Sequence, residues 1–204
     1  QEASRKLGYQ VNRTMSLAQG LYESGLITYM RTDSLNLSQD AIAEASKVIV
    51  EKFGEKYVQP RKFSTKSKGA QEAHEAIRPT NMSTLSGGAD EQQKKLYDLI
   101  WKRTIASQMS DAELERTTAN IENDAGLKFI AKGEMISFDG FLKIHIDSSK
   151  DDNSNLLPNL TQGEYVTLIN ATATERFSRP PGRFTEATLV KSMEELGIGR
   201  PSTY

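Results

Sequence analysis

The sequence predicts an α+β fold, in which a helical module comes first, a β-rich module follows and a short helical segment ends the chain. In the first half apolar residues recur at helical spacing, whereas beyond Arg116 they alternate with polar residues, which is typical of strands. With 204 residues and 37% hydrophobic content, the chain can bury a core. We therefore expect a helical domain at 1–114, a β-rich segment at 115–174 and a truncated helical segment at 175–204.

Two short helices joined by a tight turn open the predicted helical domain. Gln1 to Leu7 fits a helix that ends at Gly8, and Val11 to Ser24 fits a second helix. An extended run from Leu26 to Met30 follows. Helix, turn, helix and strand is the order found in winged-helix DNA-binding modules, so the sequence predicts a winged-helix-like arrangement here.

Two longer helices complete this domain. Ser38 is a predicted N-cap for a helix that ends at Gly54, and a second helix is expected from about Asp90 to Met109. The residues 57–68 between them are polar and predict an exposed loop. Residues 71–77 fit one helical turn before a proline, and this turn would bring side chains four residues apart onto one face.

The second half of the chain has the pattern of strands and turns. Asn123 to Gly126 supplies a turn signal, and Thr185 is a predicted N-cap for a last helix that ends at Gly197. Strands are expected near Leu127–Ala131, Gly140–Ile146 and Tyr165–Ala173.

Composition excludes several classes of protein. The formal net charge is −1, so the whole chain does not attract phosphate over long distances, and a nucleic-acid site must be a local patch. The absence of cysteine excludes disulfides and Cys-ligated zinc and is compatible with a reducing cytoplasm. No apolar run approaches the roughly 20 residues that span a bilayer, and the N-terminus lacks the plan of a signal peptide. We therefore expect a cytoplasmic protein.

The segment Gly25-Leu-Ile-Thr-Tyr-Met-Arg-Thr-Asp-Ser34 carries the clearest chemical signal. Tyr29 and Arg31 are two residues apart in the predicted strand, so their side chains share a face. Tyrosine has a pKa of about 10 and needs a base or nearby positive charge to act as a nucleophile. The planar guanidinium of Arg31 matches phosphate oxygens and can stabilise a pentacovalent phosphorus. By spacing alone, however, such residues most often form a packing pair.

Four segments, taken in order along the chain, resemble bacterial type IA DNA topoisomerases. They are Leu26–Ser34, Gln71–Pro79, Leu96–Arg103, and Arg183–Ala187 followed by Gly197–Thr203. The resemblance runs from Gln1 to Tyr204 and is least specific in the β region. It implies a toroidal parent protein, in which a helical tyrosine-bearing domain is held at the end of a β arch. It also implies that this chain is an internal fragment without the N-terminal Toprim domain.

The resemblance implies catalytic roles for three residues. Tyr29 would attack a phosphodiester of single-stranded DNA, leaving a 5′-phosphotyrosine and a free 3′-hydroxyl that can rejoin without ATP. This agrees with the absence of a P-loop signature. Arg31 would lie near the scissile phosphate. His74 would bond a phosphate oxygen or the tyrosine hydroxyl, although a lone histidine is usually a surface or core residue.

The DNA contacts predicted from this sequence are Arg78, Arg183, Arg200 and Thr203. Arg78 would join His74 on one face if residues 71–77 are helical. Arg183 belongs to a cluster that is either a solvated charge run or a phosphate-tracking edge, and we favour the second. The resemblance implies that Arg200 and Thr203 contact DNA close to the break.

We expect no metal site and no cofactor within this chain. The resemblance implies that Mg²⁺ is held in the full-length parent by the Toprim domain, so the fragment alone should not relax negatively supercoiled DNA. A non-catalytic winged-helix-like DNA-binding module is the main alternative, but the helix 11–24 carries only Arg13 as a cation, which favours the enzyme. A tyrosine recombinase or nicking enzyme is a third possibility without its motifs here. His145 has no predicted role.

Overall fold

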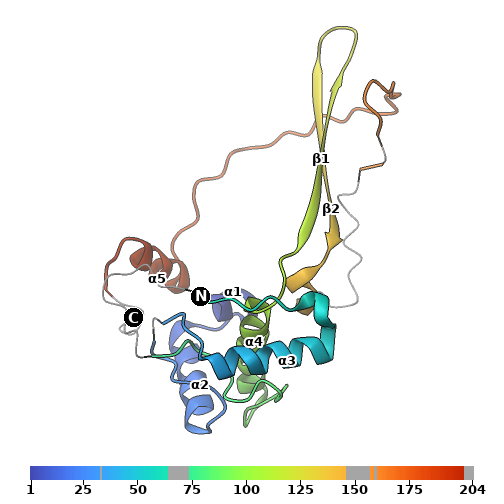
Figure 1. Cartoon of the computed structure of the whole chain (residues 1–204). Helices are drawn as coiled ribbons and strands as arrows, with labels where there is room; N and C mark the ends of the chain where they lie inside the picture. Colours follow the sequence, from blue (N-terminus) through green and yellow to red (C-terminus); the bar gives the residue numbers. More distant parts are fainter. Residues whose placement is uncertain (33, 64–73, 146–156, 159, 200–204) are drawn as a thin grey trace. The chain divides into compact units, whose positions relative to one another are not determined.

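The computed structural model describes residues 1–32, 34–63, 74–145, 157–158 and 160–199. In these ranges it contains helices α1 (Glu2–Leu7), α2 (Val11–Glu23), α3 (Gln39–Phe53), α4 (Glu91–Ser107) and α5 (Glu186–Glu195), strands β1 (Glu113–Glu122) and β2 (Lys128–Phe138), and 3₁₀ turns η1 (Glu55–Tyr57) and η2 (Gly140–Ile144) (Figure 1). The mixed helix-and-sheet class is therefore confirmed. The chain divides into two compact units, and each is described by itself.

Unit 1 consists of the described residues within Gln1–Ser110, Gly140–His145 and Phe184–Tyr204, and it contains all the α-helices named above. Capping side chains fix where these helices begin. The Ser38 hydroxyl accepts a hydrogen bond from the Ala41 amide at 3.2 Å, and the Asp90 carboxylate accepts one from the Gln93 amide at 2.7 Å. The predicted helices are thus confirmed to within about two residues, the usual uncertainty of helix ends.

The core of unit 1 lies around α2 and α4. Leu21 of α2 and Tyr97 and Ile105 of α4 are fully buried. Two polar groups of α4 reach the preceding loop: the Trp101 indole N–H donates to the Met82 carbonyl at 2.8 Å, and the Tyr97 hydroxyl donates to the Thr84 carbonyl at 2.9 Å. These bonds let the aromatic side chains be buried without leaving a polar atom unpaired.

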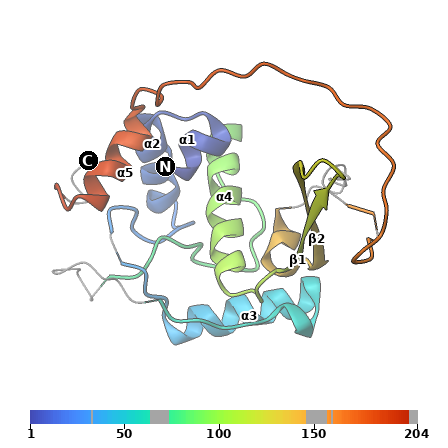
Figure 2. The same ribbon diagram turned by 90° about the horizontal axis from the view of Figure 1, so that it is seen from above.

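Helix α5 lies beside the beginnings of α1 and α2 in unit 1 (Figure 2). The Val11 amide donates to the Glu186 carboxylate at 3.3 Å, and the Gln1 side chain donates to the Glu194 carboxylate at 3.1 Å. The α5 N-terminus has a capping box built by Thr185 and Thr188. The predicted last helix is confirmed, including its cap.

The strand predicted at Leu26–Met30 is wrong. The described part of unit 1 has isolated β-bridges and no strand, so the winged-helix-like arrangement is not seen. In its place, Ile27 forms a single antiparallel bridge with Pro79, flanked by hydrogen bonds from the Thr28 amide to the Arg78 carbonyl at 2.9 Å and from the Thr80 amide to the Leu26 carbonyl at 3.0 Å. Among the described residues, backbone pairing does not continue beyond Thr28, so the segment forms a single bridge and not a strand.

The helical turn predicted at 71–77 is not formed in its described part. Residues 71–73 lie outside the described ranges, and residues 74–79 are not helical. The Ala76 amide donates to the Asn36 carbonyl at 2.8 Å, so a remote backbone group takes the hydrogen bond that a helical turn would use. His74 and Arg78 therefore do not share the face of a helical turn, although the sequence predicted this for a helical segment at 71–77.

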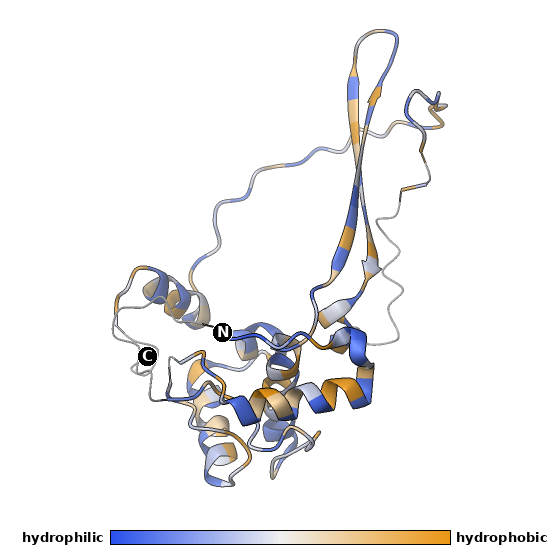
Figure 3. Cartoon of the chain, in the orientation of Figure 1, coloured by the Kyte–Doolittle hydropathy of each residue, from blue (hydrophilic) through white to orange (hydrophobic). Residues whose placement is uncertain are grey.

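Unit 2 comprises the described residues within Asp111–Asp139 and Ile146–Arg183. Strands β1 and β2 of this unit form an antiparallel hairpin in which Thr117 pairs with Gly133. The predicted turn is confirmed: Gly126 has φ of 78°, and the Asn123 side chain accepts hydrogen bonds from the backbone amides at Ala125 and Leu127. Polar and apolar residues intermingle along both strands (Figure 3).

Two predicted strands of the second half are wrong. Gly140–Ile144 is a 3₁₀ turn that belongs to unit 1. Residues 165–173 have no regular secondary structure, and Tyr165 and Ile169 are 99% and 95% exposed. A strand needs a neighbour to take its backbone hydrogen bonds, and within the described chain none pairs with 165–173.

No helix in the described ranges combines the length and apolar character that a membrane crossing requires.

Candidate functional site

Tyr29 lies just beyond the Ile27–Pro79 bridge, with its side chain 43% exposed. Met30, the next residue, is buried, and this fixes the backbone on which the tyrosine is carried. The ring of Tyr29 meets the ring of Tyr22 from α2 edge-on, with centroids 5.2 Å apart and an interplanar angle of 64°. Among the described residues no group hydrogen-bonds the Tyr29 hydroxyl. The hydroxyl is therefore available to a ligand.

Arg31 is exposed, two residues beyond Tyr29. Because buried Met30 separates the two exposed residues, the burial pattern is the one expected of an extended segment with Tyr29 and Arg31 on the solvent side. In the part of the chain that the structure describes, no carboxylate pairs with the Arg31 guanidinium. A guanidinium in this state can bind an anion such as a phosphate.

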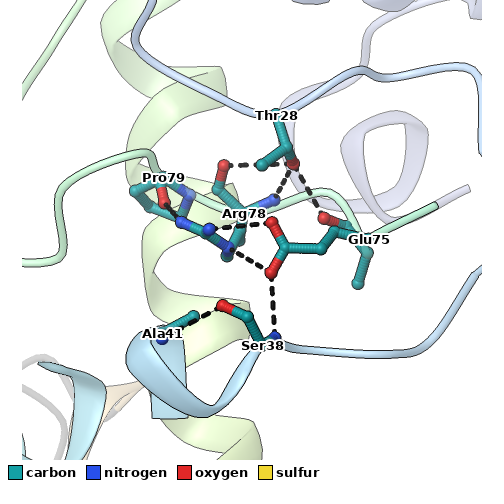
Figure 4. A network of polar contacts seen from close by, with 7 residues as sticks. Thr28, Ser38, Ala41, Glu75, Arg78 and Pro79 are labelled. Atoms are coloured by element: carbon teal, nitrogen blue, oxygen red, sulfur yellow. Dashed lines mark hydrogen bonds and ion pairs between the residues drawn. The ribbon is translucent and has the colours of Figure 1, made fainter. Parts of the chain in front are cut away.

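The backbone beside Tyr29 is fixed by Thr28 (Figure 4). The Thr28 hydroxyl donates to the Ala76 carbonyl at 2.7 Å and accepts from the Arg78 amide at 2.9 Å, while the Thr28 amide donates to the Arg78 carbonyl at 2.9 Å. These residues are about 50 positions apart along the chain. The segment that carries Tyr29 and the segment that follows His74 are therefore joined through Thr28.

The second half of this network is an ion pair between Glu75 and Arg78. The Arg78 guanidinium donates to the two Glu75 carboxylate oxygens, through Nη2 at 2.8 Å and through Nε at 3.3 Å, and Nη1 donates to the Pro79 carbonyl at 2.8 Å. The Arg78 side chain is only 14% exposed. The same Glu75 carboxylate accepts from the Ser38 amide at 2.8 Å, which ties it to the beginning of α3.

The charge state of Glu75 follows from these contacts. Burial alone would raise the pKa of Glu75, but hydrogen bonds from Arg78 and Ser38 and the positive charge of Arg78 outweigh burial and lower the pKa below its usual value. Glu75 is therefore ionised at neutral pH and pairs with a permanent cation.

The other predicted site residues do not all belong to the unit that carries Tyr29 in the described chain. His74 is exposed and directly precedes Glu75, so it lies on the segment that Thr28 joins to Tyr29. Arg183 is exposed and belongs to unit 2. Arg200 and Thr203 lie outside the described residues. Arg78 lies next to the site, but its guanidinium is bonded within the protein, and this geometry favours a structural role over a contact with DNA.

Sequence reasoning missed Thr28, Glu75 and Tyr22. Glu75 and Arg78 are three residues apart within one of the segments that carry the resemblance, and a polar Thr28 interrupts an apolar run, so weak signals were present. The Tyr22–Tyr29 ring contact had no signal, because it depends on how the chain turns at Gly25, where φ is 70°.

In the described ranges, no three His, Asp or Glu side chains are grouped so that they could hold a metal ion.

An exposed tyrosine, beside an arginine with no ion-pair partner among the described residues and on a segment fixed by remote contacts, is a site suited to phosphoryl transfer. A family model described as DNA topoisomerase matches residues 1–204, and the chain belongs to this family. Among its curated relatives, DNA topoisomerase 1 of Zymomonas mobilis is 47% identical over 216 residues, and DNA topoisomerase 1 of Mycolicibacterium smegmatis is 47% identical over 222 residues. Both alignments cover 100% of this chain.

The fold agrees with a solved structure of this family. Full-length topoisomerase I from Thermotoga maritima matches with a TM-score of 0.83 and 40% identity, covering 100% of this chain and 34% of that one. The chain spans only 18% of the Zymomonas protein and 24% of the Mycolicibacterium protein. Family membership is thus established over the whole chain, while the relatives are much longer.

Proposed function

We propose that this chain forms part of a type IA DNA topoisomerase, in which Tyr29 cleaves and rejoins one DNA strand through a 5′-phosphotyrosine. One observation carries the proposal. Tyr29 is exposed, without a hydrogen bond to its hydroxyl from the described residues, on a backbone that Thr28 and buried Met30 hold in place. A tyrosine that served only the core would be buried with its hydroxyl bonded, as Tyr97 is.

The proposed reaction is a transesterification that can run in both directions. The Tyr29 oxygen forms a bond to phosphorus, and the bond from phosphorus to the 3′-oxygen of the DNA breaks. The phenol proton leaves as the bond forms, and the departing 3′-oxygen takes up a proton. Because one phosphoester replaces another, the 3′-hydroxyl can reverse the reaction without ATP after a strand has passed.

Arg31 and His74 are the proposed catalytic partners of Tyr29. The Arg31 guanidinium would bind the scissile phosphate and stabilise the charge of the pentacovalent transition state. The exposed His74 imidazole would hydrogen-bond a phosphate oxygen or the tyrosine hydroxyl. We propose Arg183, Arg200 and Thr203 as contacts to the DNA backbone, with Arg200 and Thr203 close to the break.

Other parts of the parent protein would complete the enzyme. We propose that a Toprim domain of the same protein supplies the acidic ligands for Mg²⁺, and that the parent acts in the cytoplasm on single-stranded regions of negatively supercoiled DNA. The 204 residues alone would then fail to relax DNA. The non-catalytic binding module is disfavoured, because Arg13, the one cation of α2, donates to Gln92 of α4.

The test mixes this chain with a separately made N-terminal portion of the parent and end-labelled single-stranded DNA, and detects covalent adduct after denaturation. We expect an adduct at the 5′-phosphate side of the break, mapped by peptide mass to Tyr29. Tyr29→Phe should form none while binding DNA normally, since only one hydroxyl is removed. Cleavage by this variant, or no adduct from a demonstrably assembled wild-type complex, would contradict the proposal.

A further inference from the structure

We propose that Glu75 and Arg78 form a positioning clamp that sets the distance between the Tyr29 segment and the His74 segment, and that Arg78 acts through this clamp and not by touching DNA. The inference rests on the proposed function of Tyr29. Glu75 and Arg78 would not touch the reacting atoms but would align the side chains that do.

The donors of the Arg78 guanidinium are engaged within the protein. Three nitrogens of the Arg78 guanidinium donate to protein oxygens, two at the Glu75 carboxylate and one at the Pro79 carbonyl. The side chain is 14% exposed, whereas the Arg31 side chain is exposed and has no such bonds among the described residues. A phosphate would have to break this bidentate pair before it could use the same donors.

The clamp lies beside both Tyr29 and His74 in the sequence. Thr28 precedes Tyr29 directly, and its hydroxyl and amide are bonded to the backbone at Ala76 and Arg78. Glu75 follows His74 directly, and its carboxylate is bonded to Arg78. Tyr29 and His74 are therefore each one position away from a residue of the network, so a shift at the clamp changes the spacing between these two side chains.

The clamp is anchored at the beginning of α3. The Glu75 carboxylate also accepts from the Ser38 amide, and the Ser38 hydroxyl in turn caps α3 through the Ala41 amide (Figure 4). Helix α3 packs buried Ile42, Ala45 and Ile49 into unit 1. The carboxylate thus ties the His74 segment, to which Thr28 joins the Tyr29 segment, to a rigid element, and rigid support is what alignment to a fraction of an ångström requires.

The test uses the full-length parent and single-turnover cleavage of labelled single-stranded DNA, with binding measured separately. We expect Glu75→Ala and Arg78→Ala to slow cleavage by a similar factor, up to about 100-fold, because small misplacements of reacting groups have effects of this size. The dissociation constant for DNA should not change. The double variant should be no slower than the slower single variant, because both substitutions break one unit.

A matched control is the ion pair between Glu91 and Lys94 in the first turns of α4. It has the same three-residue spacing and a contact of 2.8 Å, but Glu91 is 77% exposed. Glu91→Ala should leave cleavage unchanged. Glu75→Gln, which keeps an oxygen acceptor but loses the charge, should cleave at an intermediate rate.

A readout independent of activity is hydrogen exchange at the Thr28 amide. In Glu75→Ala this amide should exchange faster, while the amides of α4 stay protected, which separates local loosening from unfolding. If the alanine variants do not fold, Glu75→Gln and Arg78→Lys replace them in the same assays. Both should then slow cleavage and leave the dissociation constant for DNA unchanged.

Three outcomes would overturn the clamp. A folded Glu75→Ala enzyme that cleaves at the wild-type rate would do so. So would additive effects of the two alanine substitutions. An Arg78→Ala enzyme that binds DNA more weakly, with a salt slope smaller by about 1 and with Glu75→Ala unaffected, would show a direct phosphate contact. A failure of the proposed function looks different, because the wild-type enzyme would then form no adduct at Tyr29.

Discussion

At the scale of single residues, the ring of Tyr29 has one aromatic neighbour within the described ranges, and this contact leads to a prediction. Tyr22→Ala removes the ring that meets the Tyr29 ring edge-on, while Tyr22→Phe keeps it. Aromatic pairs contribute about 0.5–1.5 kcal/mol, so cleavage by Tyr22→Ala in the parent should slow by roughly 2- to 10-fold. Single-turnover rates measure this. A Tyr22→Phe enzyme as slow as Tyr22→Ala would show that the hydroxyl, not the ring, is required.

The second prediction at this scale concerns acid. Because the pKa of Glu75 is lowered in the folded chain, the ionised carboxylate stabilises the fold above the ordinary pKa of 4.5, and this contribution is lost as the pH falls through the lowered folded value. Thermal unfolding of the chain should therefore lose more stability below pH 4.5 than that of Glu75→Gln. Parallel losses in the two proteins would show that the pair does not contribute.

Tyr29, Arg31 and His74 could be proposed from the sequence because the signal for each is local, in a short motif. The partnership of Thr28 with Arg78 could not, because it joins residues 50 positions apart and its bonds are mostly to backbone atoms, which every residue has. The structure also changed the reading of Arg78, since the sequence shows a cation but not the carboxylate that occupies it.

At the scale of elements, the longer helices could be predicted, whereas of the predicted strands the one near Leu127–Ala131 is confirmed, as the beginning of β2, and the others are not. A helix forms most of its backbone hydrogen bonds within one segment, and an N-cap residue marks its start in the sequence. Ser38 and Thr185 are such residues. Strand formation depends on a partner that the sequence does not name. Residues 26–30 and 165–173 have strand-like patterns, yet the first forms one bridge and the second has no partner in the described chain.

The cap of α3 gives the prediction at this scale. Ser38→Ala removes the acceptor of the Ala41 amide but keeps the Ser38 backbone amide that Glu75 uses. The expected cost is about 0.5–2 kcal/mol, with a lower melting temperature by roughly 2–4 °C per kcal/mol for a chain of this size. Calorimetry measures it, and Ser38→Thr, which keeps a hydroxyl, is the control. A Ser38→Ala chain as stable as the wild type would show that the cap is dispensable.

At the scale of the whole molecule, a hydrogen bond within unit 1 joins the chain before the hairpin to the chain after it. The Phe141 amide donates to the Ser110 carbonyl at 2.9 Å, so the two chain ends that lead into the hairpin are already joined within unit 1. Replacing residues 112–138 with a short Gly-Ser linker should leave the melting temperature of unit 1 nearly unchanged. Far-UV circular dichroism and calorimetry measure this. A large loss of helix would show that the hairpin is required for unit 1 to fold.

The buried indole of Trp101 is an intrinsic fluorescence probe of unit 1. It is the single tryptophan of the sequence and lies in α4, while the residues of unit 2 include none. Emission excited at the red edge of indole absorption therefore follows the core of unit 1 alone, with no label. If unfolding curves from emission and from circular dichroism coincide, the two units melt as one cooperative body, and if they separate, the gap between the curves measures the independence of the hairpin unit.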